Sequence, residues 1–251
     1  MQTLQAVFLG VLQGITEWLP ISSEGQTLLT MINWLHISPE TAFSYSIFLH
    51  LGTMSAVMLK FRKEFFEMLT DLNSTLSRTV IVATIFTGIS GLPLYLLIKE
   101  TFSGGVQATL IIGFLLIATG LILRSQRSGT KDLEDITLLD MIILGLAQGL
   151  AILPGISRSG TTMTVLLLRN VRQEISLTLS FLISVPAVIG AVVLDHSYTS
   201  ISLKTSMAMF LASLIAGYFT MDLLLKFARS IDFSKFCITL GLLTIILTTL
   251  L

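Results

Sequence analysis

Leu19-Pro20-Ile21-Ser22-Ser23-Glu24-Gly25 and Leu153-Pro154-Gly155-Ile156-Ser157-Arg158-Ser159-Gly160 are two polar breaks, each inside a long apolar stretch. The stretches that contain them are Leu4–Leu35 and Ile136–Leu168. Proline and glycine interrupt helices. Within a bilayer, non-helical backbone is tolerated only where protein or a water-filled cavity satisfies its polar groups. Each stretch therefore predicts a re-entrant hairpin, in which two short helices meet at a polar turn.

The rest of the chain has the composition of an integral membrane protein. Of its 251 residues, 53% are hydrophobic and 12% are charged, whereas soluble domains carry about 25% charged residues. About 20 apolar residues cross a bilayer as a helix. Six stretches reach or approach that length: Phe43–Leu59, Thr79–Ile98, Val106–Leu123, Leu177–Leu194, Ser206–Leu225 and Phe236–Leu251. The predicted fold class is all-α integral membrane, with six transmembrane helices and two re-entrant helical hairpins.

The basic residues predict the orientation, because loops on the cytoplasmic side are enriched in Lys and Arg. Only Lys99 and Lys204 fall in one set of loops, and Arg158 lies in the second break. The opposite set holds twelve: Lys60, Arg62, Lys63, Arg78, Arg124, Arg127, Lys131, Arg169, Arg172, Lys226, Arg229 and Lys235. Placing these twelve inside makes the first hairpin enter from outside and the second from the cytoplasm. Both termini then lie outside.

The two broken stretches also align with each other. At an offset of 135 residues they share eight identities, which pair Leu9, Gly10, Gln13, Gly14, Ile21, Ser22, Gly25 and Thr27 with Leu144, Gly145, Gln148, Gly149, Ile156, Ser157, Gly160 and Thr162. Because the orientation rule gives the two hairpins opposite directions, we interpret the halves as inverted-topology repeats, an architecture seen in transporters. One transmembrane domain, 1–251, would hold repeat one (about 1–124), a cytoplasmic linker (about 125–135) and repeat two (about 136–251).

Ionisable side chains inside these apolar stretches are the candidate functional residues, since burying charge in a membrane costs several kcal/mol. They are Glu17 and Glu24 in the first hairpin and Arg158 in the second. Gln13 lies one helical turn before Glu17 and shares its face. Hydroxyl side chains surround the three charges in sequence: Ser22, Ser23, Ser157, Ser159, Thr161 and Thr162.

This combination favours a phosphate group held at the membrane. The planar guanidinium of Arg158 matches phosphate geometry. Backbone N–H groups of its glycine-rich break, beginning at Gly155, suit an anion nest. A carboxylate beside a phosphate implies either a bridging cation or acid–base work by the carboxylate. The alternative is that Arg158 and Glu17 form an ion pair that only pins the hairpins together.

These motifs resemble the undecaprenyl-diphosphate phosphatase family, also called the bacitracin-resistance family. Its first signature is similar to Gln13-x-x-x-Glu17 followed by Leu19-Pro20-Ile21-Ser22-Ser23, and its second to residues 154–162, Pro-Gly-Ile-Ser-Arg-Ser-Gly-Thr-Thr. The resemblance covers nearly the whole chain. It implies an enzyme of the plasma membrane that cleaves a polyprenyl diphosphate to the monophosphate and so regenerates the lipid carrier for cell-wall glycan assembly. It also implies dependence on a divalent cation (Mg²⁺ or Ca²⁺) and an active site opening to the outer face.

The family's functional residues carry over to matching positions. Gln13 and Glu17 match its acidic or amide pair and would hold the cation. Arg158 matches its phosphate-binding arginine, and Ser23, Ser157, Ser159 and Thr162 match its site hydroxyls. The resemblance leaves open whether a serine or water attacks phosphorus, and we take Ser23 as the candidate nucleophile.

The chain departs from the family pattern directly after the paired serines. The pattern continues there with a small hydroxyl residue, Gly and His, whereas this chain has Glu24, Gly25 and Gln26. Gln26 can bond a phosphate oxygen but cannot shuttle a proton near neutral pH. Either Glu24 takes over proton transfer or metal binding, or hydrolysis has been lost. His50, in an apolar stretch, is a second candidate replacement, or else a neutral histidine bonded to a neighbouring helix.

Three functions remain open on the sequence: hydrolysis of a polyprenyl diphosphate, transport or flipping of a phosphorylated lipid, and silent binding of such a lipid. The motifs favour the first, and the inverted repeat suits the second. The formal net charge of zero offers no attraction for nucleic acid. The expected partners are the bilayer and the lipid, with a homodimer as a further expectation.

Overall fold

The structure is a computed structural model that describes residues 2–101, 105–124, 129–195, 202–228 and 233–250. Helices joined by turns and loops make up the described residues, with no β-strand among them. In chain order the α-helices are α1 (Thr3–Thr16), α2 (Ser23–Leu29), α3 (Pro39–Lys60), α4 (Arg62–Thr70), α5 (Thr75–Thr101), α6 (Gly105–Leu123), α7 (Leu138–Leu150), α8 (Arg158–Leu168), α9 (Gln173–Leu194), α10 (Leu203–Ala228) and α11 (Phe233–Leu250). A π-helical turn, Thr30–Trp34, extends α2.

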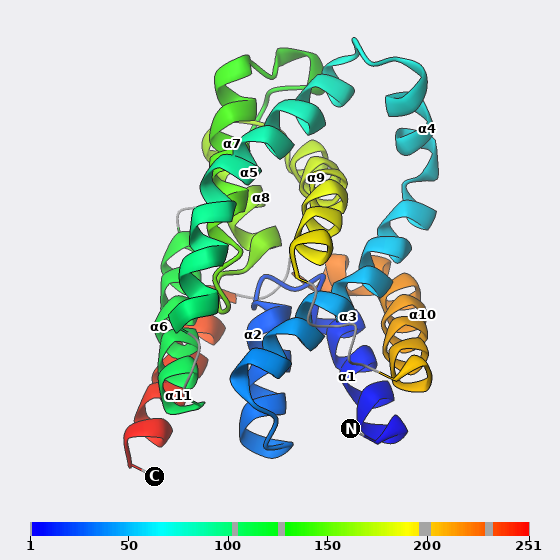
Figure 1. The fold of residues 1–251 in the computed structure, drawn as a ribbon. Coiled ribbons are helices and arrows are strands. Elements are labelled where there is room, and N and C mark those ends of the chain that lie inside the picture. Colours follow the sequence, from blue (N-terminus) through cyan, green and yellow to red (C-terminus); the bar gives the residue numbers. More distant parts are fainter. Residues whose placement is uncertain (1, 102–104, 125–128, 196–201, 229–232, 251) are drawn as a thin grey trace.

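Six helices are long and apolar enough to cross a bilayer, as predicted. These are α3, α5, α6, α9, α10 and α11, with lengths of 18 residues or more in their apolar segments. Each contains one of the predicted stretches apart from the final residue, Leu251, which lies outside the described part. Figure 1 shows both termini at one end of the bundle and α4 at the other. The chain is therefore a multi-pass membrane protein in which the termini share one end.

The helix α4 was not predicted. It lies in the basic segment between the first two long helices, and nine residues are too few to cross a bilayer. Its apolar side chains Phe66 and Leu69 are 69% and 78% exposed. Such a short helix with mixed polarity leaves no long apolar run in the sequence, so hydropathy alone does not reveal it.

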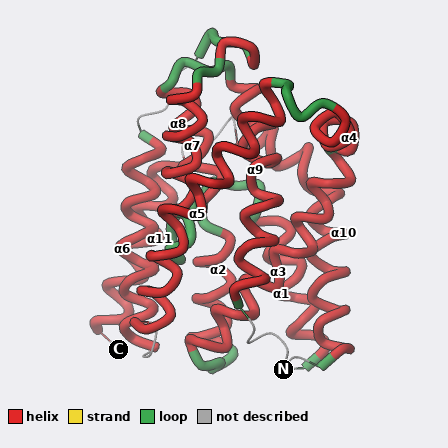
Figure 2. The backbone as a smooth tube through the Cα atoms, turned by 45° about the horizontal axis from the view of Figure 1, so that its top comes forward, coloured by secondary structure: helices red, strands yellow, loops and turns green. Residues whose placement is uncertain are grey.

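Each broken stretch forms two short helices, as predicted. The first helix of the first pair, α1, ends at Thr16, and α2 begins at Ser23. In the second pair α7 ends at Leu150, and α8 begins at Arg158. Figures 1 and 2 show the α1–α2 pair towards the end that carries the termini and the α7–α8 pair towards the opposite end. The two polar turns meet between them, which positions the candidate site.

Glycines bring the short helices into backbone contact with long ones. A Cβ atom at Gly14 would lie 2.6 Å from the Gly217 nitrogen, and one at Gly149 would lie 2.7 Å from the Gly91 nitrogen. Side chains do not tolerate such distances, so only glycine fits. As a result α1 packs on α10 and α7 packs on α5. The first helix of each short pair is thus held by a long helix from the other half of the chain.

A buried carboxylate anchors the start of α7. Asp140 is fully buried, and its oxygens accept hydrogen bonds from Arg169 Nε (2.5 Å), Lys131 Nζ (3.1 Å) and the Thr137 hydroxyl (2.8 Å). Burial by itself raises the pKa of Asp140, but the bonds from Arg169, Thr137 and Lys131 outweigh it and hold this pKa below its usual range. The charged carboxylate therefore ties α7 to the end of α8 and to the segment before α7.

Replacing Asp140 by asparagine is expected to lower the free energy of unfolding by about 2–3 kcal/mol, because charged hydrogen bonds are lost and two cations lose their partner. A carboxyl whose pKa is lowered by folding stabilises the protein above its unfolded pKa of about 3.9 and loses that effect as pH falls. The wild type should therefore lose stability below about pH 4 more steeply than the variant does. Thermal unfolding in detergent at several pH values measures both effects.

Asp132 provides the matched control. It pairs with Arg172 at 2.6 Å, but its side chain is 61% exposed, and exposed pairs contribute about 0–1 kcal/mol. Asp132→Asn should therefore leave the unfolding temperature nearly unchanged. Equal effects of the two substitutions would show that Asp140 is not a structural anchor.

Candidate active site

The two polar turns touch each other at the centre of the protein. The hydroxyl oxygen of Ser22 accepts hydrogen bonds from the Gly25 nitrogen (3.2 Å) and the Gly155 nitrogen (3.1 Å). Gly155 has φ +112°, and a Cβ there would lie 2.7 Å from the Ile112 carbonyl oxygen, so this position requires glycine. Ser22 therefore caps α2 and joins it to the second turn, with only its hydroxyl hydrogen left to donate.

Glu17 is the most connected side chain of the site. It is 7% exposed, and its Oε2 accepts hydrogen bonds from Ser23 Oγ (2.6 Å) and Gln13 Nε2 (2.9 Å). Its Oε1 pairs with Arg158 of the other hairpin. His50 Nε2, from α3, lies 3.4 Å from Oε2. These donors fix the carboxylate in one orientation, next to a serine hydroxyl.

Arg158 is the first residue of α8, and three contacts fix its guanidinium. Nη1 donates to the Ser180 carbonyl oxygen at 3.1 Å, and Nη2 donates to Glu17. The guanidinium carbon lies 5.8 Å from the ring centre of Phe181, which packs edge-to-face on Trp18 at 5.4 Å. This stack links the second hairpin to the first. It holds the planar fork of Arg158 beside Glu17 before any ligand binds.

Ser46, on α3, supports both Glu24 and His50. Its hydroxyl lies 3.3 Å from Glu24 Oε1, and its carbonyl oxygen lies 2.7 Å from His50 Nδ1. Among the described residues Glu24 Oε2 has no hydrogen-bond partner. Glu24 therefore keeps one free carboxyl oxygen, whereas both nitrogens of His50 face protein oxygens.

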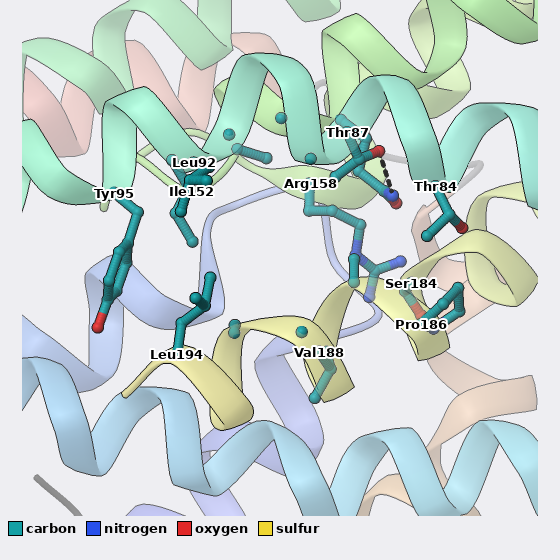
Figure 3. A pocket seen from close by; sticks show the side chains of 18 of the residues that line it. Thr84, Thr87, Leu92, Tyr95, Ile152, Arg158, Ser184, Pro186, Val188 and Leu194 are labelled. Carbon is teal, nitrogen blue, oxygen red and sulfur yellow. Dashed lines mark hydrogen bonds between the residues drawn. The ribbon is translucent and has the colours of Figure 1, made fainter. Parts of the chain in front are cut away.

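Two hollow spaces meet at these residues. The smaller, of about 30 Å³, is lined mainly by polar groups, among them Glu17, Ser22, Ser23, Glu24, His50, Ser157, Arg158 and Ser159. The larger is a mostly apolar cleft of about 240 Å³ between α5 and α9. Figure 3 shows Arg158 and Thr87 towards one end of this cleft and Tyr95 and Leu194 at the other. We call the first the head pocket and the second the tail cleft.

The structure brings eight of the predicted site residues together in the head pocket: Glu17, Ser22, Ser23, Glu24, His50, Ser157, Arg158 and Ser159. Gln13 lies behind Glu17. Thr161 is buried, and Thr162 bonds Ser180 at 2.7 Å. Gln26 donates to the Ile21 carbonyl oxygen at 3.0 Å. Like Gln13 and Gly155, these last three residues line neither space.

Sequence reasoning did not assign roles to two serines that support the site. Ser46 contacts Glu24 and His50, and the carbonyl of Ser180 accepts from Arg158. A signal was present, because Ser46 and Ser180 are separated by 134 residues, close to the offset of 135 residues at which the two broken stretches align. The tail cleft was not predicted either, because it depends on how far α5 and α9 stand apart.

Comparisons with known proteins identify a family and relatives that match nearly the full length of the chain. The family model described as "Bacitracin resistance protein BacA" matches residues 6–246. A relative from Methanothrix thermoacetophila, named undecaprenyl-diphosphatase, is 58% identical over 253 residues, which cover 100% of this chain and 98% of the relative. A relative of the same name from Methanopyrus kandleri is 41% identical over 248 residues, covering 94% and 92%. The chain therefore belongs to the bacitracin resistance protein BacA family.

Proposed function

We propose that this chain is a membrane phosphatase that hydrolyses a polyprenyl diphosphate of the undecaprenyl type to the monophosphate, and so recycles the lipid carrier for cell-envelope glycan synthesis. The observation that carries the proposal is the meeting of Glu17, Ser23 and Arg158, from the two polar turns, beside an apolar cleft that Arg158 also lines. Its relatives carry the name undecaprenyl-diphosphatase.

The side chains that line the head pocket suit the binding of phosphate oxygens. Arg158 offers a fixed fork of N–H donors, the geometry that phosphate oxygens bind. Ser157 and Ser159 add hydroxyl donors next to it. Donors that are oriented before the reaction stabilise the negative charge that develops in the transition state. Arg158 would therefore bind the terminal phosphate and lower the barrier to its transfer.

Ser23 is the proposed nucleophile. Its hydroxyl donates to Glu17 Oε2 at 2.6 Å, and both groups are at most 7% exposed. A serine hydroxyl attacks phosphorus when a neighbouring base takes its proton. Glu17 is that base, and Gln13 and His50 hold it in place. The product of the attack is a phosphoserine and a free prenyl monophosphate.

We place the proposed divalent cation beside Glu17. Gln13 Oε1 is buried and has no hydrogen-bond partner in the described part of the chain, and Mg²⁺ and Ca²⁺ take such amide and carboxylate oxygens as ligands. No group of three or more His, Cys, Asp or Glu suited to a metal occurs among the described residues. Gln13 and Glu17 would thus hold the ion together with substrate oxygens, as magnesium sites commonly do. A bound cation supplies charge neutralisation of the diphosphate.

The tail cleft suits the prenyl chain. It is mostly apolar, and it starts at Arg158 and runs between α5 and α9. Side chains added at Gly88 on α5 or Gly190 on α9 would meet no atom within 4 Å. The cleft is therefore open where both glycines stand, and wide enough there for an extended hydrocarbon. This arrangement puts the diphosphate in the polar centre while its tail stays in an apolar surrounding.

We infer that the halves are inverted repeats with re-entrant hairpins. The Ser22 and Ser157 hydroxyls each accept from the nitrogen three residues on, in Gly25 and Gly160, at equivalent positions of the two turns. The packing of α1 on α10 matches the packing of α7 on α5. In both cases a short helix of one half packs on a long helix of the other half. Such packing is expected when two inverted units interdigitate. The proposed limits remain about 1–124 and 136–251, with a linker partly outside the described residues.

An active site that opens to the outer face follows from the same topology. The ten described basic residues of the predicted cytoplasmic set all lie in or beside the segments that join the helices at that end. Tyr95 and Leu194, at the far end of the tail cleft, precede the opposite, basic-poor segments. The cleft thus leads from the centre towards the outer leaflet.

The unequal chemistry of the halves favours hydrolysis over lipid transport. By the repeat, Glu17 corresponds to Ile152 and Ser23 corresponds to Arg158. In a carrier that alternates between two equivalent states, we expect the two halves to contribute similar residues to the binding site. Here one half supplies the base and the nucleophile, and the other supplies the phosphate-binding cation. That division of roles is what a reaction centre needs.

The test is phosphate release from a polyprenyl diphosphate by the purified protein in detergent, with Mg²⁺ or Ca²⁺. We expect release by the wild type and a loss of about 10³-fold or more in Glu17→Ala, which lacks the base for Ser23. Glu40→Ala, at an exposed position of α3, is the control and should retain full activity. A folded wild type that releases no phosphate from several chain lengths would overturn the proposal.

A further inference from the structure

Glu24 lies where the two spaces join. Four residues line both the head pocket and the tail cleft, and they are Glu24, His50, Ala151 and Arg158. Ser23 and Glu17 line only the head pocket. If the terminal phosphate lies against Ser23 and the prenyl chain lies in the cleft, the oxygen that bridges the two phosphates lies at this junction. The junction residues are therefore the ones that meet the breaking bond.

We propose that Glu24 is the acid–base catalyst of both halves of the reaction. It gives a proton to the bridging oxygen as the prenyl monophosphate leaves, and it then takes a proton from the water that attacks the phosphoserine. This inference rests on the proposed function. It assigns to Glu24 the proton transfer for which the family pattern has a histidine two positions further on, where this chain has Gln26.

The in-line geometry of phosphoryl transfer explains why one group serves both steps. The attacking and leaving oxygens stand on opposite sides of phosphorus. Ser23 attacks from the head pocket, so the leaving oxygen departs towards the junction. When water later displaces Ser23, it must arrive opposite the serine, through the space that the leaving group vacated. A carboxyl at the junction is therefore placed as acid for the first displacement and as base for the second.

The protons and bonds balance over the two steps. In the first, the bond from Ser23 Oγ to the terminal phosphorus forms and the bond from phosphorus to the bridging oxygen breaks. The serine proton passes to Glu17, and the acid form of Glu24 protonates the leaving oxygen. In the second, the Glu24 carboxylate takes a proton from water, water oxygen bonds to phosphorus, and Glu17 returns its proton to Ser23. The net reaction consumes one water and releases phosphate.

The surrounding contacts favour Glu24 over His50 for this role. Both nitrogens of His50 face protein oxygens, Ser46 O at 2.7 Å and Glu17 Oε2 at 3.4 Å. Its ring is thus committed to holding Glu17. Glu24 is held through one oxygen only, 3.3 Å from the Ser46 hydroxyl. Its other oxygen has no partner among the described residues, so a substrate atom or water can take that place.

The residue at the family's histidine position does not face the reaction. Gln26 lines neither space and donates to the Ile21 carbonyl oxygen at 3.0 Å, which braces the turn before α2. The absence of a histidine at this position is therefore compensated by the carboxyl group of Glu24. The proton-transfer group has moved by two residues along the same turn of chain.

Glu24→Gln tests the proposal. Its amide can donate a hydrogen bond to the bridging oxygen but cannot take a proton from water. We expect steady-state phosphate release to fall by about 10²–10⁴-fold. With a prenyl diphosphate that carries ³²P in its terminal phosphate, labelled phosphoserine should accumulate on Ser23 and disappear in the Glu24→Gln/Ser23→Ala protein. Glu24→Asp, which keeps a shorter carboxyl, should release phosphate at an intermediate rate without accumulating label.

Glu40→Gln is the matched control, since Glu40 is exposed, and it should behave as the wild type. Each protein must elute as a single folded species in detergent and bind substrate. Release by Glu24→Gln within tenfold of the wild type would overturn the assignment. If Glu24→Gln releases no phosphate and no labelled protein accumulates, the role of Glu24 in the second step is overturned. Inactivity of the wild type would instead count against the proposed function itself.

Discussion

Replacing Arg158 by lysine is expected to reduce kcat/KM for a polyprenyl diphosphate by about 10²–10³-fold, the loss seen when one pre-oriented donor to a transition-state charge is removed. Lysine keeps the positive charge but not the planar fork. It can still pair with Glu17, so the two hairpins stay together. The measurement is phosphate release with substrate titration, alongside thermal unfolding in detergent.

This substitution distinguishes two roles of Arg158, which are phosphate binding and a purely structural ion pair with Glu17. If the Arg158–Glu17 pair only joins the two turns, Arg158→Lys will change kcat/KM less than tenfold, because lysine keeps the pair. Arg172→Lys is the control, because Arg172 is 50% exposed and bonds Asp132 away from the site. It should alter neither quantity. A catalytic defect with an unchanged unfolding temperature is the outcome that the geometry predicts.

Replacing Gly190 by leucine is expected to lower kcat/KM for long prenyl diphosphates by about 10–100-fold, because overfilling a packed space costs about 1–3 kcal/mol. A Cβ at Gly190 meets no atom within 4 Å, so the leucine side chain extends into the tail cleft instead of into protein. The prenyl tail is already in an apolar phase before it binds. The loss of kcat/KM therefore comes from steric exclusion of the tail and not from a change in the free energy of hydrophobic transfer.

Chain length is the readout that identifies this effect. The shortest prenyl diphosphate that the wild type hydrolyses should be affected least, and Gly88→Leu should act in the same direction. Gly105→Leu is the matched control, since a Cβ there only makes ordinary contact with Ile32 at 3.6 Å. Equal losses for short and long substrates in Gly190→Leu would mean that the tail does not lie in this cleft. Leucine favours helix over glycine, so folding should not suffer.

The predicted site depended on signals of different strength. Glu17, Glu24 and Arg158 were found because ionisable groups are rare in apolar stretches and need a reason to be there. His50 was found on the same ground, and the structure places it 3.4 Å from Glu17. Gln26 was selected by its position in a motif, and the structure turns it towards Ile21 instead. A position in a motif does not fix the direction in which a side chain points.

The six long helices, the two polar breaks and the charged residues within them were predictable from the amino-acid sequence. These follow from local physics, because hydropathy over about 20 residues decides insertion and the closely spaced proline and glycine residues of the two polar turns interrupt the helices there. Three features required the folded structure: the contact of Glu17 with Arg158, the contact of Ser46 with Glu24, and the cleft beside Gly190. Those contacts join residues far apart in the chain. Their formation depends on how closely glycine-bearing helices approach and where they stand apart, which local periodicity does not encode.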